Sequence, residues 1–166
     1  MERAQAAVIT NVAAYHLGEY GINTVEELIP AKFNVHSALK GDDPLILNAD
    51  DEGVVAFAES IDNRLAWFSL DAGHPVIKTH LLSGGTACYL KDGWLVAATG
   101  GAEGQSERNM IAVKDIPPAR GGAVRYNVSN ALAALSIAVS LGIPDDAVRL
   151  GLSSFKGDEH DNPGRG

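Results

Sequence analysis

Polar side chains that could bind a metal ion follow two expected strands near the start of the chain. His16 comes soon after the apolar, β-branched run 6–12, and Asp50 and Asp51 follow the buried run 44–48. Ligands of open parallel sheets bind beyond the carboxyl ends of strands, so both positions could be functional. Each has a structural alternative. His16 could be a surface or capping histidine, and the aspartates could cap the next helix, which is the interpretation we favour.

Two amides and a guanidinium in the last quarter of the chain could contact a nucleotide. Asn127 and Asn130 stand at the start of an Ala- and Leu-rich stretch that predicts a helix over 128–141. Amides at such a position can cap the helix or hydrogen-bond to a base or ribose. Arg165 lies in a polar segment with Gly and Pro, where a guanidinium can bind two phosphate oxygens or be an ordinary linker residue.

The order of apolar runs predicts an α/β fold. A strand, a helix over 54–61 and a second strand fill residues 44–70, an order typical of parallel sheets covered by helices. Residues 76–118 instead predict short strands separated by glycines, and Asp92-Gly93 suits a tight hairpin turn. We therefore expect a three-layer α/β core with a mostly parallel sheet and a small antiparallel β appendage.

Local signals predict the helix boundaries in the rest of the chain. Thr24 begins a capping box, and Pro30 would kink or divide the helix that follows. Near the end, Gly142 would stop one helix and Pro144 would open another. The tail 157–166 is polar and contains Gly and Pro, so it predicts a linker.

Composition makes several partner classes unexpected. The formal net charge of −8 comes from scattered acidic residues, so neither nucleic acid nor an anionic membrane surface is an expected partner. No stretch reaches the roughly 18 apolar residues of a membrane span. Cys88 is the only cysteine, so neither an intramolecular disulfide nor a cysteine-based zinc site can form. A reducing cytoplasm fits these features.

Four segments, in order along the chain, resemble the central domain of the Mur ligase superfamily. They are Asn11-Val-Ala-Ala-Tyr-His16-Leu-Gly18, Leu47-Asn-Ala-Asp-Asp51, Tyr126-Asn-Val-Ser-Asn130-Ala-Leu-Ala-Ala134 and Asp161-Asn-Pro-Gly-Arg165. Two further segments, Ala66-Trp-Phe-Ser-Leu70 and Gly85-Thr-Ala-Cys-Tyr-Leu-Lys-Asp-Gly-Trp94, are similar to the cyanophycin synthetase branch in particular. The resemblance covers almost the whole chain. Tyr15 is a departure, because the family usually has aspartate there.

The resemblance implies an ATP-dependent amide-bond ligase. Such enzymes phosphorylate a carboxylate and let an amine attack the acyl phosphate, and the cyanophycin synthetase branch adds arginine to aspartate side chains. The chemistry requires ATP and Mg²⁺, with positive charge on the transferred phosphoryl group. Besides ATP, the expected partner of the full-length parent is an amino acid or peptide substrate.

The resemblance also implies roles for individual residues. It assigns His16 and Lys32 to a metal site, where the family's lysine is carbamylated by carbon dioxide and takes part in catalysis. The alternative for Lys32 is a solvated lysine on a helix face. Asn127 and Asn130 would contact the nucleotide, and Arg165 would reach its phosphates and contribute to catalysis.

One family feature is missing from the printed sequence. The dipeptide Gly-Lys occurs nowhere, so there is no phosphate-binding loop of the form G-x-x-x-x-G-K-[ST]. We therefore expect residues 1–156 to be the later part of an ATP-binding central domain, and 157–166 to lead toward a further C-terminal domain. The chain alone is expected to be inactive, and its full-length parent to be a homo-oligomer. The alternative, favoured by Tyr15 and Pro30, is a degenerate, noncatalytic nucleotide-binding or scaffolding module.

Overall fold

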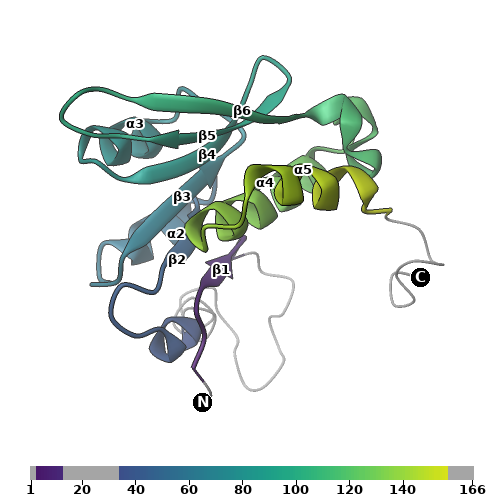
Figure 1. The fold of residues 1–166 in the computed structure, drawn as a ribbon. Coiled ribbons are helices and arrows are strands. Elements are labelled where there is room, and N and C mark those ends of the chain that lie inside the picture. Colours follow the sequence, from purple (N-terminus) through teal and green to yellow (C-terminus); the bar gives the residue numbers. More distant parts are fainter. Residues whose placement is uncertain (1–2, 13–33, 157–166) are drawn as a thin grey trace.

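A single mixed sheet forms the centre of the molecule. The computed structural model describes residues 3–12 and 34–156, and within them six strands follow the order β1-β2-β3-β4-β5-β6 (Figure 1). The strands are β1 Ala7–Ile9, β2 Leu45–Asn48, β3 Leu65–Ser69, β4 Thr86–Lys91, β5 Trp94–Thr99 and β6 Ser106–Ala112. Strands β1 to β4 pair in parallel, and β4 to β6 pair antiparallel. The predicted α/β class with a mostly parallel sheet is confirmed.

Helices cover both faces of the sheet. On one face lie α2 (Glu52–Ala58) and α3 (Pro75–Leu82), and on the other lies α4 (Arg125–Ser140), with α5 (Asp145–Ser154) antiparallel to it (Figure 1). Short 3₁₀ helices complete the described elements: η2 Asn34–Ala38, η3 Val113–Asp115 and η4 Pro117–Gly122. The buried residues form two apolar clusters, one on each face of the sheet. This is the expected three-layer arrangement.

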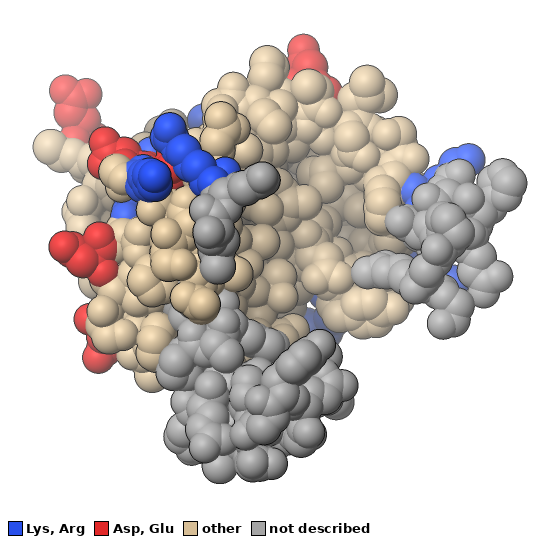
Figure 2. Space-filling view, turned by 90° about the horizontal axis from the view of Figure 1, so that it is seen from below, with Lys and Arg blue, Asp and Glu red and all other residues tan. Residues whose placement is uncertain are grey.

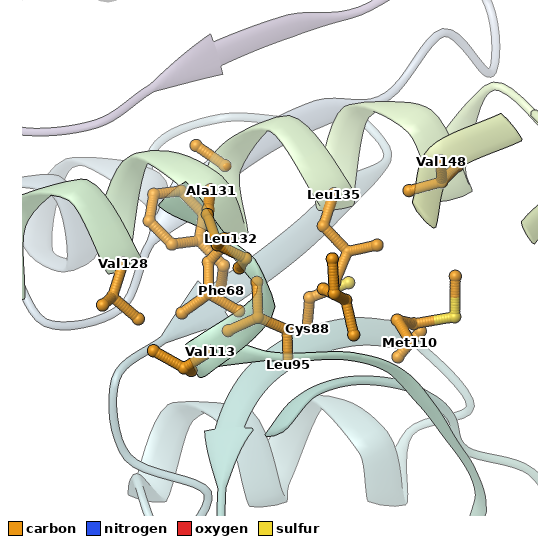
Figure 3. Packing of buried hydrophobic residues seen from close by; sticks show 14 of the residues in the cluster. Phe68, Cys88, Leu95, Met110, Val113, Val128, Ala131, Leu132, Leu135 and Val148 are labelled. Atoms are coloured by element: carbon orange, nitrogen blue, oxygen red, sulfur yellow. The ribbon is translucent and has the colours of Figure 1, made fainter. Parts of the chain in front are cut away.

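Helix α4 packs against the sheet through one apolar stripe. Val128, Leu132 and Leu135 follow helical spacing and point from α4 toward Phe68 of β3 and Leu95 of β5 (Figure 3). Four of these side chains are fully buried, and Val128 is 1% exposed. Burial of each such side chain contributes roughly 1.5–3 kcal/mol. The position of α4 is therefore strongly determined by this core.

The segment Pro75–Leu82 corrects the sequence prediction, which placed short strands from residue 76 onward. It is helix α3, with Pro75 in the first turn and His74 as the N-cap, whose Nδ1 accepts a hydrogen bond of 3.3 Å from Val76 N. Ile77 and Leu81, one helical turn apart, enter the core. The β-branched residues of this segment suggested a strand, but burial of one helical face decides the outcome.

The antiparallel strands extend the main sheet. Asp92 and Gly93 both have positive φ angles, 50° and 77°, so the predicted hairpin turn is confirmed. Strand β4 pairs in parallel with β3, with Trp67 opposite Ala87, which makes the hairpins the continuation of the same sheet. Within the described ranges, no helix has both the length and the hydropathy that a membrane crossing requires.

Candidate functional site

Hydrogen bonds tie together the carboxyl ends of the first three strands. The Asn48 side chain donates to the Thr10 carbonyl at 2.8 Å, which joins the ends of β2 and β1. Asp50 accepts from the Ser69 hydroxyl at 2.5 Å and from Leu70 N at 2.8 Å, which joins the ends of β2 and β3. The edge where ligands of parallel sheets bind is therefore a connected polar layer.

The Asp51 carboxylate hydrogen-bonds both to helix α2 and to the segment that follows β1. One carboxylate oxygen accepts from Val54 N at 3.0 Å and caps α2, and the other accepts from Val12 N at 2.8 Å. The preferred capping interpretation is thus confirmed for Asp51. It is wrong for Asp50, whose carboxylate instead accepts hydrogen bonds from Ser69 and Leu70 at the end of β3. In the part of the chain that the structure describes, no group of three or more His, Cys, Asp or Glu side chains could hold a metal ion.

Three predicted site residues, His16, Lys32 and Arg165, lie outside the described residues, as do Tyr15 and Pro30. The metal site, the carbamylated lysine and the phosphate contact therefore stay predictions. Val12, the last described residue before His16, is held at the carboxyl edge of the sheet by Asp51.

The two predicted nucleotide ligands, Asn127 and Asn130, line one groove of about 610 Å³ between α4 and α5. The Asn127 amide donates to the Pro118 carbonyl at 2.8 Å and so fixes η4 against α4, while Asn130 is exposed. The rest of the lining is apolar: Ile116, Pro118, Ala131, Ala134, Ala138, Ile143, Ala147, Val148, Gly151, Leu152 and Phe155. Apolar walls with a few polar groups are typical of small-molecule sites.

The start of α4 provides little evidence for the capping alternative. Val124 occupies the N-cap position and makes no capping bond through its side chain, and the Asn127 side chain bonds to Pro118 instead. The C-terminal half of α4 lies over the amino ends of β3 and β4, because Ser136 and Ser140 share a small cavity with Ala66 and Thr86. The first turns of α4, with both asparagines, therefore lie toward the carboxyl ends of these strands.

Comparison with protein families decides the assignment. Residues 2–138 match the family model described as the Mur ligase middle domain. The protein belongs to the Mur ligase family. The three-layer α/β core of the described residues agrees with this membership at the level of fold.

Curated relatives of this Mur ligase middle domain include two kinds of ligase. Cyanophycin synthetases from Crocosphaera subtropica and a Nostoc species are 31% and 32% identical to it over 164 residues, or 99% of the chain. A UDP-N-acetylmuramoylalanine–D-glutamate ligase from Chlorobaculum parvum is 31% identical over 160 residues, or 95% of the chain. The chain spans 18% of the length of the first two relatives and 32% of the third.

A solved structure shares the fold. A crystal structure of MurF from Acinetobacter baumannii superposes with a TM-score of 0.57, covering 95% of this chain and 30% of that one, at 19% identity. The similarity of the middle domains therefore extends from sequence to three-dimensional arrangement.

A second polar cluster of this Mur ligase middle domain lies on the antiparallel strands. Glu107 accepts hydrogen bonds from the Tyr89 hydroxyl at 2.6 Å, from Lys91 Nζ at 2.7 Å and from the Gln105 amide at 2.7 Å. The bond from Lys91 lowers the pKa of Glu107, and burial together with Glu107 raises the pKa of Tyr89. Glu107 is therefore ionised and Tyr89 neutral at neutral pH. The spacing of these residues does not reveal the cluster, because its members come together only through the pairing of the strands.

A second groove, of about 430 Å³, lies between α2 and α3 and was also not predicted. Trp67, Val76 and His80 are among its lining residues. Burial lowers the pKa of His80, so its ring is neutral at neutral pH, and its Nε2 atom is buried without a hydrogen-bond partner.

Proposed function

We propose that this Mur ligase middle domain forms part of the nucleotide site of an ATP-dependent amide-bond ligase. The main support is the groove between α4 and α5, which has mostly apolar walls and is lined by Asn127 and by the exposed amide of Asn130. A flat purine has apolar faces and a polar edge, which matches this combination of wall and amide. In this proposal Asn130 hydrogen-bonds to the base or ribose, and Asn127 supports it while holding Pro118.

The proposed reaction follows from the relatives. Cyanophycin synthetases match nearly the whole chain, so we propose that the parent protein adds arginine to aspartate side chains through an acyl phosphate. ATP with Mg²⁺ supplies the phosphoryl group and neutralises its charge. The carboxylates Asp50 and Asp51 are already engaged by backbone and hydroxyl donors, so they are not the proposed magnesium ligands.

The proposed metal and phosphate contacts fall on three residues outside the described part of the chain. His16 and a carbamylated Lys32 would help to hold Mg²⁺, which prefers oxygen ligands. Arg165 would bind nucleotide phosphates, for which a guanidinium is well suited. In the same proposal, residues 1–156 are part of the ATP-binding domain and 157–166 connect it to a further domain. The homo-oligomeric state of the parent and its cytoplasmic location stay predictions.

Tyr15 keeps a second candidate function open, a noncatalytic nucleotide-binding or scaffolding module. Tyr15 stands where the family usually has aspartate, so a carboxylate that could orient His16 is missing. The two candidates differ in one respect. A ligase parent releases phosphate from ATP when both an amine and a carboxylate substrate are present, whereas a noncatalytic parent binds nucleotide without that release.

Calorimetric titration of the chain with MgADP, MgATP and MgGDP tests the proposed nucleotide site. We expect the adenine nucleotides to bind, and Asn130→Ala to weaken MgADP binding about fivefold to tenfold, because a hydrogen bond to the nucleotide is lost. Asn63→Ala, in the loop before β3, is the matched control and should leave the affinity unchanged. Equal affinities for the unchanged chain and Asn130→Ala would contradict the assignment of Asn130.

A further inference from the structure

Strand β6 contains one extra residue, Met110, at an irregularity in its pairing with β5. Leu95 of β5 pairs with Ile111 and Val96 pairs with Asn109, so Met110 has no partner on β5 and forms a β-bulge. Its side chain is 1% exposed and packs in the core beneath α4 and α5 (Figure 3). The buried side chain keeps the bulge in place.

A guanidinium from α5 binds the carbonyls of this bulge. Arg149 Nε donates to the Met110 carbonyl at 2.8 Å, and Arg149 Nη2 donates to the Asn109 carbonyl at 3.5 Å. The remaining guanidinium nitrogen, Nη1, donates to Asp146 Oδ1 at 2.9 Å within α5. A planar guanidinium offers several donors in a fixed geometry, so one side chain can define the position of α5 against β6.

The same helix forms one wall of the nucleotide groove. Ala147, Gly151 and Phe155, spaced four residues apart, line the groove together with Val148 and Leu152. Helix α5 has only 10 residues, and a helix of that length is marginal by itself, so tertiary contacts must hold it. Val148 and Leu152 pack α5 into the core, and Arg149 adds hydrogen bonds to the backbone of β6.

We propose that Arg149 is a positioning residue for the groove. By binding the bulge carbonyls it fixes the distance between the α5 wall and the α4 wall that carries Asn130, without touching the ligand itself. This inference rests on the proposed nucleotide function of the groove. It predicts that loss of Arg149 displaces the α5 wall and weakens nucleotide binding even when the protein remains folded.

A nearby ion pair provides a matched control. Arg108 binds Asp145 at the start of α5 at 3.2 Å, and both side chains are at least one third exposed. Exposed pairs of this kind contribute about 0–1 kcal/mol. Arg108→Met therefore removes a charge and a contact between β6 and α5 but leaves the bulge carbonyls bound.

The test uses the whole chain labelled with ¹⁵N, in the forms Arg149→Met, Arg149→Lys, Arg108→Met and unchanged, all at a temperature where each is folded. The measured quantities are the MgADP dissociation constant, the side-chain amide signals of Asn130, and hydrogen exchange of the α5 backbone. We expect Arg149→Met to weaken MgADP binding about fivefold, to shift the Asn130 signals and to speed exchange in α5. Arg149→Lys should restore part of each effect, and Arg108→Met should match the unchanged chain.

Two different results would contradict the two proposals separately. If Arg149→Met matches Arg108→Met in all three measurements, Arg149 does not position the groove. If Arg149→Met does not fold, the same comparison is made with Arg149→Lys. If the unchanged chain binds no MgADP, the proposed nucleotide function fails. In that case the Asn130 signals and α5 exchange still decide whether Arg149 holds the wall.

Discussion

The Ser69 hydroxyl at the end of β3 donates a 2.5 Å hydrogen bond to Asp50, which follows the end of β2. The second oxygen of the same carboxylate accepts from Leu70 N at 2.8 Å. Ser69 is fully buried, so its hydroxyl needs this partner. The pair therefore fixes the relative position of two strand exits at the edge where a ligand of this fold would bind.

A double-mutant cycle should detect the coupling between these two residues. We expect Asp50→Ala and Ser69→Ala each to lower the free energy of unfolding by about 1–3 kcal/mol, because each removes partners from buried polar groups. The double variant should lose less than the sum, with a coupling of about 1 kcal/mol, measured by urea denaturation. Additive losses would show that the two side chains act independently.

Asp51 should be important for stability through two bonds at once. Asp51→Ala removes both the α2 cap and the bond to Val12 N, so we expect a loss of about 2 kcal/mol in unfolding free energy. Asp51→Asn retains one acceptor oxygen and should lose less. Asp62→Ala, at an exposed loop position, is the control and should change stability by no more than about 0.5 kcal/mol. Equal effects of Asp51→Ala and Asp62→Ala would contradict the shared-bond interpretation.

Local sequence signals predicted most of the elements and the parallel pairing of β2 with β3, but not that the antiparallel strands continue the same sheet. The Asp92-Gly93 turn and the helix end at Gly142, whose φ is 70°, follow from residues that tolerate positive φ, and both predictions are confirmed. Helix α3 was missed because its β-branched residues favour a strand locally. The parallel pairing of β3 with β4 depends on contacts distant in sequence, which no local pattern encodes.

The candidate site was predictable only in part for the same reason. The amides of Asn127 and Asn130 could be identified from residue type and resemblance, and the structure brings both to one groove. The sequence could not predict the hydrogen bond from Asn127 to Pro118 or the anchoring of α5 by Arg149, because both join segments that meet only in the folded chain.

Gly100 should tolerate no side chain, in contrast to its neighbour. A Cβ atom at Gly100 would overlap the Leu81 carbonyl oxygen at the end of α3, so we expect Gly100→Ala to cost about 3 kcal/mol or more. At Gly101 the nearest atom, Gly104 O, would be 3.9 Å away, so Gly101→Ala should be close to neutral. Urea denaturation compares the two variants, and equal stabilities would contradict the close packing of α3 on this turn.

The stability of the protein should fall at high pH through Cys88. Burial raises the pKa of its thiol from 9.0 to about 11, so the unfolded state ionises first as pH rises above about 9. Below that pH the thiol is neutral in both states and contributes no pH dependence. Between pH 8.5 and 10 the free energy of unfolding of the unchanged protein should fall by roughly 1 kcal/mol more than that of Cys88→Ala. Tyr89 is present in both proteins, so its contribution cancels in this comparison. Parallel stability curves would contradict this.

On the face seen in Figure 2, the charged side chains of the described residues lie mostly toward the edges. The most direct measurement of the central proposal uses ¹³C-methyl alanine labels at Ala131 and Ala134 of the groove, with MgADP as ligand. We expect nuclear Overhauser contacts from these methyl groups to the adenine protons, and weaker contacts in Asn130→Ala at the same subsaturating MgADP concentration. Bound MgADP without such contacts would contradict a nucleotide site in this groove.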